Sequence, residues 1–243
     1  MTTVIKLGGS IITDKDRPET VDRETLDRAA TALSESDDRL VVVHGAGSFG
    51  HHHASKHGVS TTNGTHDDEV VRDIHGSMKR LNDAVVDALA EAGVPAVPVH
   101  PLSAATRSEE ADLSFPVSPV ETMLDEGFVP VLHGDVIAHE GSGATILSGD
   151  EIIVSLATAL DADHVGLCSA VRGVYDDDGN VIDQIEQFED VAGAVGGSDS
   201  TDVTGGMAGK VRALLALDAP AHVFDISGLD EFIAGETPGT KIE

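Results

Sequence analysis

The sequence predicts an α/β protein built around a mainly parallel sheet. Strand-like apolar runs alternate with helix-like segments along the chain, and glycines mark many of the boundaries between them. The run RLVVV at 39–43 is almost continuously apolar, which is typical of a strand buried in a parallel sheet. Residues 68–93 repeat apolar side chains every three or four positions, and this spacing predicts a long amphipathic helix.

The other elements follow from the same two patterns. Strands are predicted where short β-branched or apolar runs end at glycine or polar turns: 4–7, 39–43, 94–100, 128–135, 163–170 and 221–227. Helices are predicted where apolar residues keep a helical spacing: 20–34, 68–93, 118–126, from the turn at 148–150 through 160, and 204–219. The acidic stretch 198–202 predicts an exposed loop.

The composition indicates a folded protein with a strongly acidic surface. The 243 residues hold 43 acidic and 15 basic side chains, for a formal charge of −28. Such a surface repels nucleic acid and anionic membranes, and the chain has no Trp and only one Tyr to stack on bases. Because the apolar pattern argues against disorder, we interpret the acidic coat as an adaptation to a salt-rich interior, where salt screens repulsion.

Two further features bear on location. Cys168 is the only cysteine, so no disulfide can form within the chain and a reducing interior is plausible. The start MTTVIKLGGS lacks the apolar core of a signal peptide, and no apolar run reaches the roughly 18 residues of a membrane span. We therefore expect a cytoplasmic protein that has neither a membrane nor a nucleic-acid partner.

Three glycine-rich turns carry the strongest functional signal. They are KLGGS at 6–10, GAGSFG at 45–50 and TGGMAGK at 204–210. Glycine lets the backbone bring its N–H groups close to an anion, and a helix start adds partial positive charge. One such turn is weak evidence, because an ordinary turn looks the same, but three in one α/β chain indicate a ligand with several phosphates. None has the Walker A spacing, and no acidic residue on a following strand supports a dinucleotide site.

Lysines accompany these turns in a chain that holds only six of them. Lys6 leads into the first turn, Lys15 lies nine residues further on, and Lys210 lies in the third turn. In phosphoryl transfer, charge spreads over the transferring oxygens, and catalysis is mostly positioning and cationic stabilisation. Three lysines could supply that stabilisation, although lysines are most often solvated surface residues.

The second glycine turn runs into three consecutive histidines, 51–53. The turn and its histidines could be a phosphate cradle or a metal site. Adjacent histidines alternate faces on a strand and spread by about 100° each on a helix, which disfavours a shared metal. His53 and His57 do have the i,i+4 spacing of two ligands on one helix face, so a surface metal site stays an alternative.

Four segments together resemble the amino acid kinase superfamily: KLGGS at 6–10, HGAGSFGH at 44–51, SGD at 148–150 and DVTGGMAGKV at 202–211. Within it, GSFGH resembles the archaeal isopentenyl phosphate kinases. The resemblance covers essentially the whole chain and implies a three-layer αβα sandwich with a mainly parallel central sheet. It also implies a homodimer and the phosphorylation of isopentenyl phosphate to isopentenyl diphosphate, with ATP and Mg²⁺, in the alternative mevalonate route to isoprenoids.

Carried onto this sequence, the resemblance implies three overlapping groups of site residues. Those implied in catalysis are Lys6, Lys15, His51 and Asp150. Those implied to bind ATP are Lys6, Gly8, Gly9, Ser10, Gly47, Tyr175, Gly206 and Lys210. Those implied to bind the acceptor are Ala46, Gly50, His51, Gly149 and Asp150, with His51 on the acceptor phosphate. On this interpretation His52 and His53 are bystanders, and no side chain is assigned as a metal ligand.

The resemblance places one kinase domain over residues 1–243, with about 1–150 on the acceptor side and about 151–243 on the nucleotide side. The sequence departs from the family pattern in two places. Ala46 stands where a glycine is usual, and its methyl is tolerated if φ is negative. The stretch 169–175 lacks the usual acidic pair before Gly-Val-Tyr, which bears on the nucleoside contacts and on the preference for ATP.

Other functions stay open at this point. A different small-molecule kinase of the same fold would act on a carboxylate, carbamate, phosphonate or nucleotide, and a non-catalytic member would sense a nucleotide or metabolite. His51 argues against the carboxylate kinase, since that acceptor has no obvious need of it. The presence of Lys6, Lys15 and Lys210 together argues against a sensor.

Overall fold

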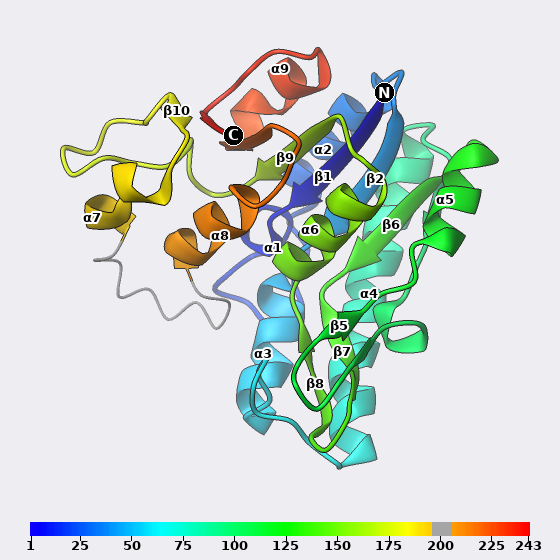
Figure 1. Ribbon diagram of the computed structural model, residues 1–243. Coiled ribbons are helices and arrows are strands. Elements are labelled where there is room, and N and C mark those ends of the chain that lie inside the picture. Colours follow the sequence, from blue (N-terminus) through cyan, green and yellow to red (C-terminus); the bar gives the residue numbers. More distant parts are fainter. Residues whose placement is uncertain (196–205) are drawn as a thin grey trace.

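The computed structural model describes residues 1–195 and 206–243, which are arranged around two sheets (Figure 1). The large sheet has eight strands in the order β10-β12-β11-β9-β1-β2-β6-β3, and the small sheet has four in the order β5-β4-β7-β8. Neighbours in the large sheet are parallel except for β11 and β12. Helices cover both of its faces, so the predicted αβα sandwich with a mainly parallel sheet is confirmed.

The elements have the following bounds. The strands of the large sheet are β1 (Thr2–Leu7), β2 (Arg39–His44), β3 (Ala96–Pro98), β6 (Val129–His133), β9 (His164–Cys168), β10 (Gln184–Ile185), β11 (Ala221–Phe224) and β12 (Thr240–Ile242). Those of the small sheet are β4 (Thr106–Arg107), β5 (Leu113–Ser114), β7 (Asp135–His139) and β8 (Gly143–Leu147). The α-helices are α1 (Gly9–Ile12), α2 (Arg23–Ser34), α3 (Gly47–His57), α4 (Asp68–Glu91), α5 (Ser118–Asp125), α6 (Gly149–Ala159), α7 (Ala192–Val195), α8 (Gly206–Leu214) and α9 (Leu229–Ile233). The 3₁₀ turns within the described residues are η1 (Pro101–Ser103), η2 (Phe188–Asp190) and η3 (Ile226–Gly228).

Alternation along the strands divides the core between the two faces of the large sheet. Val4 and Val43 pack in the layer that holds α5, α6 and α8. Ile5 and Val42 pack in the layer that holds α1, α2, α4 and α9, and Figure 1 shows these two groups of helices on opposite sides. Because side chains alternate with period two, Lys6 shares the face of α6, whereas His44 shares the face of α4.

The central strands end level with one another. Leu7 at the end of β1 pairs with His44 at the end of β2 and with Cys168 at the end of β9. His44 in turn pairs with His133, the last residue of β6. Ligands of open α/β sheets bind beyond the carboxyl ends of the strands. The first two glycine turns therefore leave the sheet side by side, at the edge where a ligand is expected.

The predicted elements are largely present, with changed ends. The helix predicted at 20–34 starts at Arg23, because the Asp22 carboxylate accepts a hydrogen bond from the Thr25 N–H and caps it. The strand predicted at 221–227 ends at Phe224, because the next residues form the η3 turn. The helix predicted at 204–219 ends at Leu214, and its first two positions, like the loop predicted at 198–202, lie outside the described residues.

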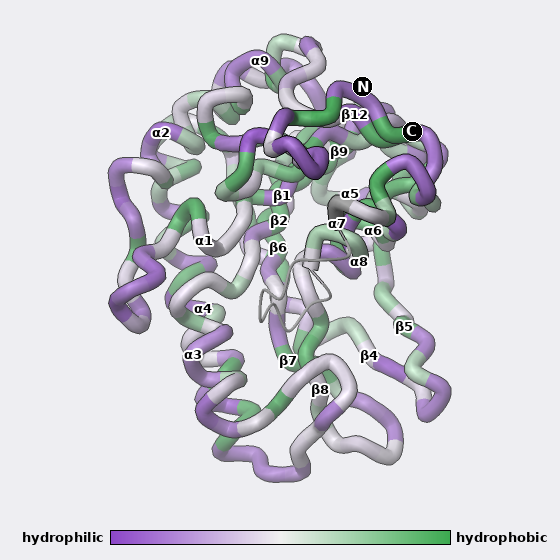
Figure 2. The backbone as a smooth tube through the Cα atoms, turned by 90° about the vertical axis from the view of Figure 1, so that its left-hand side faces the viewer, coloured by the Kyte–Doolittle hydropathy of each residue, from purple (hydrophilic) through white to green (hydrophobic). Residues whose placement is uncertain are grey.

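The small sheet is absent from the sequence-based prediction. The strand predicted at 128–135 ends at His133, and the chain starts a new strand at Asp135 that pairs with β8 in a hairpin. Gly141 and Gly143 at its tip have φ of +76° and +80°, conformations that favour glycine. The Gly-Ser-Gly string at 141–143 was the available signal for this turn. Figure 2 shows the hairpin at the end of the molecule where α3 and α4 also lie. Among the described residues, no helix combines the length and apolar character that a membrane span requires.

Candidate functional site

The first two glycine turns touch each other through their backbones. A Cβ atom at Gly9 would lie 2.1 Å from the Gly47 nitrogen, and one at Gly45 would lie 2.6 Å from the Gly9 nitrogen. A side chain at either position would collide with backbone atoms that cannot move aside cheaply. The close approach therefore requires glycine at both Gly9 and Gly45.

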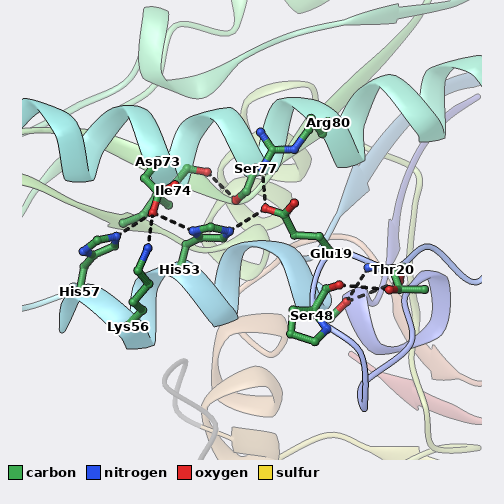
Figure 3. Close-up of polar contacts among 11 residues, drawn as sticks. Glu19, Thr20, Ser48, His53, Lys56, His57, Asp73, Ile74, Ser77 and Arg80 are labelled. Atoms are coloured by element: carbon green, nitrogen blue, oxygen red, sulfur yellow. Dashed lines mark hydrogen bonds and ion pairs between the residues drawn. The ribbon is translucent and has the colours of Figure 1, made fainter.

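Thr13 joins the two turns. Its buried hydroxyl donates to the Gly9 carbonyl at 2.6 Å and accepts the Ser48 N–H at 3.0 Å. Ser48 also holds the loop before α2, since its carbonyl accepts the Glu19 N–H at 3.2 Å and its hydroxyl lies beside Thr20 (Figure 3). Sequence reasoning assigned no role to Thr13 or Ser48. The helical i,i+4 spacing from Gly9 to Thr13 was the available signal.

Helix α3 starts directly at this crossing. Ala46 precedes the helix with φ of −73° and ψ of −28°, so the predicted tolerance of its methyl group is confirmed. Ala46 has no side-chain atom that could cap the helix, and the Thr13 hydroxyl takes that role by accepting the Ser48 N–H in the first turn. Gly47, the first helical residue, has φ of +49°. The positive end of the α3 dipole thus lies against the first glycine turn, as an anion site requires.

Lys6, Asp150 and Lys210 form a compact charged group next to these turns. The Lys6 ammonium donates to Asp150 Oδ1 at 2.5 Å, and the Lys210 ammonium lies 3.5 Å from Asp150 Oδ2. The side chains of Lys6 and Asp150 are only 11% and 14% exposed, so solvent screens the pair weakly. Two of the six lysines of this strongly acidic chain thus meet at one carboxylate.

The start of α6 fixes the position of Asp150. Ser148 caps the helix by accepting the Glu151 N–H, while Glu151 accepts the Ser148 N–H at 2.9 Å. Arg107 from β4 holds Glu151 in turn, with a hydrogen bond of 2.8 Å. A Cβ atom at Gly149 would lie 3.2 Å from Lys6 Cε, so glycine leaves room for the lysine. The spacing Ser148-x-x-Glu151 predicts such a capping box, but sequence reasoning did not use it.

The structure places the remaining predicted residues on several different elements. Gly8 donates to the Cys168 carbonyl at 2.8 Å, Ser10 is exposed on α1, and Gly206 opens α8 with φ of +63°. The described hydrogen bonds and ion pairs join Lys6, Asp150 and Lys210, but they do not join the exposed Lys15 or Tyr175 to them.

His51 lies on the exposed side of α3, one turn beyond the Gly47 end. Gly50 beside it packs on α4, where a Cβ atom would lie 2.6 Å from Met78 Sδ. The start of α3 at the glycine crossing therefore determines where His51 and Gly50 lie.

Comparison with known proteins assigns the family. The profile described as "Amino acid kinase family" matches residues 1–222, which is most of the chain. The chain belongs to the amino acid kinase family. The isopentenyl phosphate kinase of Haloferax volcanii is 66% identical over 242 residues, covering 98% of this chain and 97% of the relative. The isopentenyl phosphate kinase of Methanocaldococcus jannaschii is 31% identical over 261 residues, covering 100% and 99%.

A solved structure agrees with this assignment. The crystal structure of the T. acidophilum isopentenyl phosphate kinase product complex superimposes with a TM-score of 0.82 at 25% sequence identity, over 100% of both chains. The family and fold predicted from the four glycine-containing segments are therefore confirmed.

On the opposite face of the sheet, this member of the amino acid kinase family buries several histidines. His44 Nε2 lies 3.0 Å from Asn82 Oδ1, and His44 Nδ1 lies 3.1 Å from the Gly45 carbonyl. Complete burial lowers the pKa of His44 to about 4, so its ring is neutral at pH 7. A neutral ring has one N–H, so it can donate to only one of these oxygens. With the Asn82 amide turned by 180°, its NH₂ group would donate to His44 Nε2 and both contacts would be satisfied.

His133 continues this neutral cluster at the end of β6. Its ring stacks on that of His44 with centroids 5.6 Å apart. Its Nδ1–H donates to the Gly134 carbonyl at 2.9 Å, and its Nε2 lies 2.9 Å from His100 Nδ1. Burial lowers the pKa of His133 well below its usual value. Burial therefore favours the neutral form of both rings, although the hydrogen bonds to the Gly45 and Gly134 carbonyls act in the opposite direction and raise the pKa of each.

A hollow of about 480 Å³ lies elsewhere, beyond the ends of β9 and β11. Its lining includes Arg172, Asp225 and Glu231, but no lysine. Two carboxylates against one guanidinium do not suit a group of phosphates. The lysine–carboxylate group beside the glycine crossing is therefore the better phosphate site.

Proposed function

We propose that this chain transfers the terminal phosphoryl group of ATP to the phosphate of isopentenyl phosphate, which gives isopentenyl diphosphate and ADP. The observation that carries the proposal is the joining of Lys6 and Lys210 through Asp150, beside the crossing of two glycine turns. Its support in sequence is the 66% identity to the isopentenyl phosphate kinase of Haloferax volcanii.

On the donor side, the two lysines neutralise the ATP phosphates. Asp150 has one oxygen facing each lysine, so it orients both ammonium groups. The glycine turns offer backbone N–H groups to the same phosphates. The residues assigned to ATP are Lys6, Gly8, Gly9, Ser10, Gly47, Tyr175, Gly206 and Lys210.

On the acceptor side, the chemistry needs a phosphate clamp and no strong base. The second pKa of a phosphate monoester is near 6, so the acceptor is already an oxyanion at about pH 7. His51 donates a hydrogen bond to that phosphate, and the backbone of Ala46, Gly47 and Gly50 lies in the same first turns of α3. Lys15 stabilises the transferring group, from a loop that Ser48 ties to α3. In this account Gly149 and Asp150 complete the acceptor site.

Mg²⁺ fits this site only as a partner of the phosphates. Magnesium prefers oxygen ligands and often binds through substrate phosphates. Asp150 is the carboxylate at the centre, and its two oxygens already face Lys6 and Lys210. The ion would supply charge neutralisation of the transferring group, with the lysines acting beside it.

The same proposal divides the chain by function. Residues 1 to about 150 form the acceptor-binding lobe, which also supplies Lys6 and the first glycine turns to the ATP phosphates, and residues from about 151 to 243 form the nucleotide-binding lobe of the same domain. The family resemblance alone supports a homodimer, and the cytoplasmic location stays a prediction from the sequence.

A direct assay tests the proposal. ADP release is measured in molar KCl with Mg²⁺ and ATP, with isopentenyl phosphate compared with glutamate, aspartate, carbamate, UMP and fosfomycin. We expect strong and selective turnover of isopentenyl phosphate. Activity on another acceptor, with none on isopentenyl phosphate, would overturn the acceptor assignment and leave the lysine roles in place.

A further inference from the structure

Helices α3 and α4 bring a second group of ionisable residues together, away from the lysine–carboxylate site. His53 and His57 lie one turn apart on α3, and Asp73 faces them from α4 (Figure 3). One nitrogen of each histidine and one oxygen of Asp73 all lie within 4.8 Å of one another. The i,i+4 spacing of the two histidines thus meets a third ligand that is distant in sequence.

The two histidines converge on the same carboxylate oxygen. His53 Nδ1 lies 2.9 Å from Asp73 Oδ2, and His57 Nε2 lies 2.7 Å from it. His53 is buried, while the side chains of His57 and Asp73 are partly exposed, so an ion has an entry path from solvent. His53 is therefore held firmly, which the interpretation of it as a bystander did not anticipate.

Glu19 gives His53 the arrangement of a metal ligand. Its carboxylate lies 2.6 Å from His53 Nε2, on the side of the ring opposite Asp73. If Nε2–H donates to Glu19, the lone pair of Nδ1 points at the Asp73 oxygen, and two acceptors at 2.9 Å need a cation or a proton between them. Metal-bound histidines almost always donate their other N–H to a carboxylate, a carbonyl or water.

We propose that His53 Nδ1, His57 Nε2 and Asp73 Oδ2 bind a divalent transition-metal ion, with Zn²⁺ as the representative. Two imidazoles and one carboxylate suit Zn²⁺, Co²⁺ or Ni²⁺ better than Mg²⁺ or Ca²⁺. Ligand bonds of about 2.0–2.2 Å require ligand atoms slightly further apart than they lie here, which side-chain rotation supplies. Water completes the coordination, and the ion links α3 to α4 through its protein ligands.

Two cationic side chains lie beside this site, and one of them would compete with the metal for a ligand. The Lys56 ammonium lies 3.2 Å from Asp73 Oδ2, and Arg80 pairs with Glu19. Lys56 is 55% exposed, so it can swing into solvent when an ion arrives. Arg80 holds Glu19, not a ligand, and can stay. Removing the Lys56 charge should therefore tighten metal binding.

The test uses the full chain without a polyhistidine tag, stripped of metal with a chelator. Zn²⁺ is titrated against a chromophoric indicator in molar KCl with excess Mg²⁺, which suppresses weak binding to the acidic surface. We expect one equivalent to bind. His57→Ala and Asp73→Asn should weaken its affinity at least 100-fold, Glu19→Gln about tenfold, and Lys56→Gln should strengthen it a few-fold. His66→Ala, at an exposed histidine outside the cluster, is the matched control.

Thermal unfolding gives an independent readout. Zn²⁺ should raise the melting temperature of the parent and of His66→Ala by several degrees, and that of His57→Ala not at all. Co²⁺ should give the visible absorption of a nitrogen- and oxygen-ligated ion in the parent and in His66→Ala, but not in His57→Ala or Asp73→Asn. Equal affinity and equal stabilisation in the parent, His57→Ala and Asp73→Asn, or no binding in the parent, would overturn the proposal and leave a purely ionic cluster between α3 and α4.

Discussion

The two faces of the large sheet differ in the charge of the ionisable side chains at the ends of β1 and β2. On the α6 face, Lys6 near the end of β1 is charged and paired with Asp150. On the α4 face, His44 at the end of the neighbouring β2 is fully buried and neutral at pH 7. The two residues are one position apart in register, since His44 pairs with Leu7. The alternation of the strands alone separates them.

This difference shows how a sheet edge can present charge on one side and exclude it on the other. The α6 face holds a carboxylate between two lysines, so each charge has a partner there. On the α4 face, His44 and His133 are hydrogen-bonded to neutral groups, among them Asn82 and backbone carbonyls, and the Asp135 carboxylate lies 4.0 Å from His133 Nδ1. A charge is therefore stable on the first face and costly on the second.

The largest expected effect comes from removing the charge on the α6 face. Lys6→Met keeps the side chain as far as Cε but removes the ammonium group that donates to Asp150. We expect kcat to fall about 10²- to 10³-fold, the usual effect of removing one group that stabilises a developing charge. Steady-state kinetics with Mg²⁺, ATP and isopentenyl phosphate measures it.

Lys241→Met is the matched control for that change. Lys241 lies on β12 and pairs with Glu243 near the surface, so kcat should stay within about twofold. A Lys6→Met enzyme as active as this control would show that the charged group on the α6 face does not act in the reaction.

Acid should destabilise the protein through the α4 face. Between an unfolded pKa of 6.5 and a folded pKa of about 4, His44 binds a proton only when the chain unfolds. The free energy of unfolding therefore falls as the pH drops below about 6.5, by about 1.4 kcal/mol per pH unit for each such histidine. Above about pH 6.5, His44 should add nothing to the pH dependence of the free energy of unfolding. His133, with its pKa also lowered by burial, adds to the slope.

Denaturant unfolding at about pH 7 and about pH 5 in molar KCl measures this loss. His44→Gln should lower stability at pH 7 but flatten the dependence on pH. Asp135 works in the opposite direction at the acid end, because burial raises its pKa. A slope that His44→Gln leaves unchanged would locate the acid sensitivity outside the His44 cluster.

Substitution of His51 tests whether an exposed histidine binds the acceptor phosphate, a role that the buried His44 and His133 cannot take. His51→Ala should lower kcat/KM for isopentenyl phosphate about 100-fold, which corresponds to about 2.7 kcal/mol, with KM for ATP nearly unchanged. His52→Ala, at the next exposed position of α3, should stay close to the parent. Equal activities of the two variants would remove His51 from acceptor binding.

Much of this arrangement could be predicted from the sequence, because it depends on local pattern. The apolar run at 39–43 and the period of 68–93 identify their elements, and β2 and α4 follow at nearly the predicted bounds. The residues that meet across the fold could not be predicted in the same way. Nothing in the spacing of Lys6 and Asp150 shows that they touch, since they are 144 positions apart. Packing between elements that are distant in the sequence likewise buries His44 and turns Asp73 toward α3.

The smallest effect is expected at Thr13, which joins the two glycine turns. Thr13→Val keeps the shape of the side chain but removes the hydroxyl that donates to the Gly9 carbonyl and accepts the Ser48 N–H. Because both partners lose their hydrogen bond in a buried place, the free energy of unfolding should fall by about 1–2 kcal/mol, measured by denaturant unfolding in molar KCl. Thr13→Ser keeps the hydroxyl and should recover most of that loss. If Thr13→Val instead lowers kcat as much as Lys6→Met, the crossing of the turns governs catalysis directly, and the charged group on the α6 face acts only when that crossing is intact.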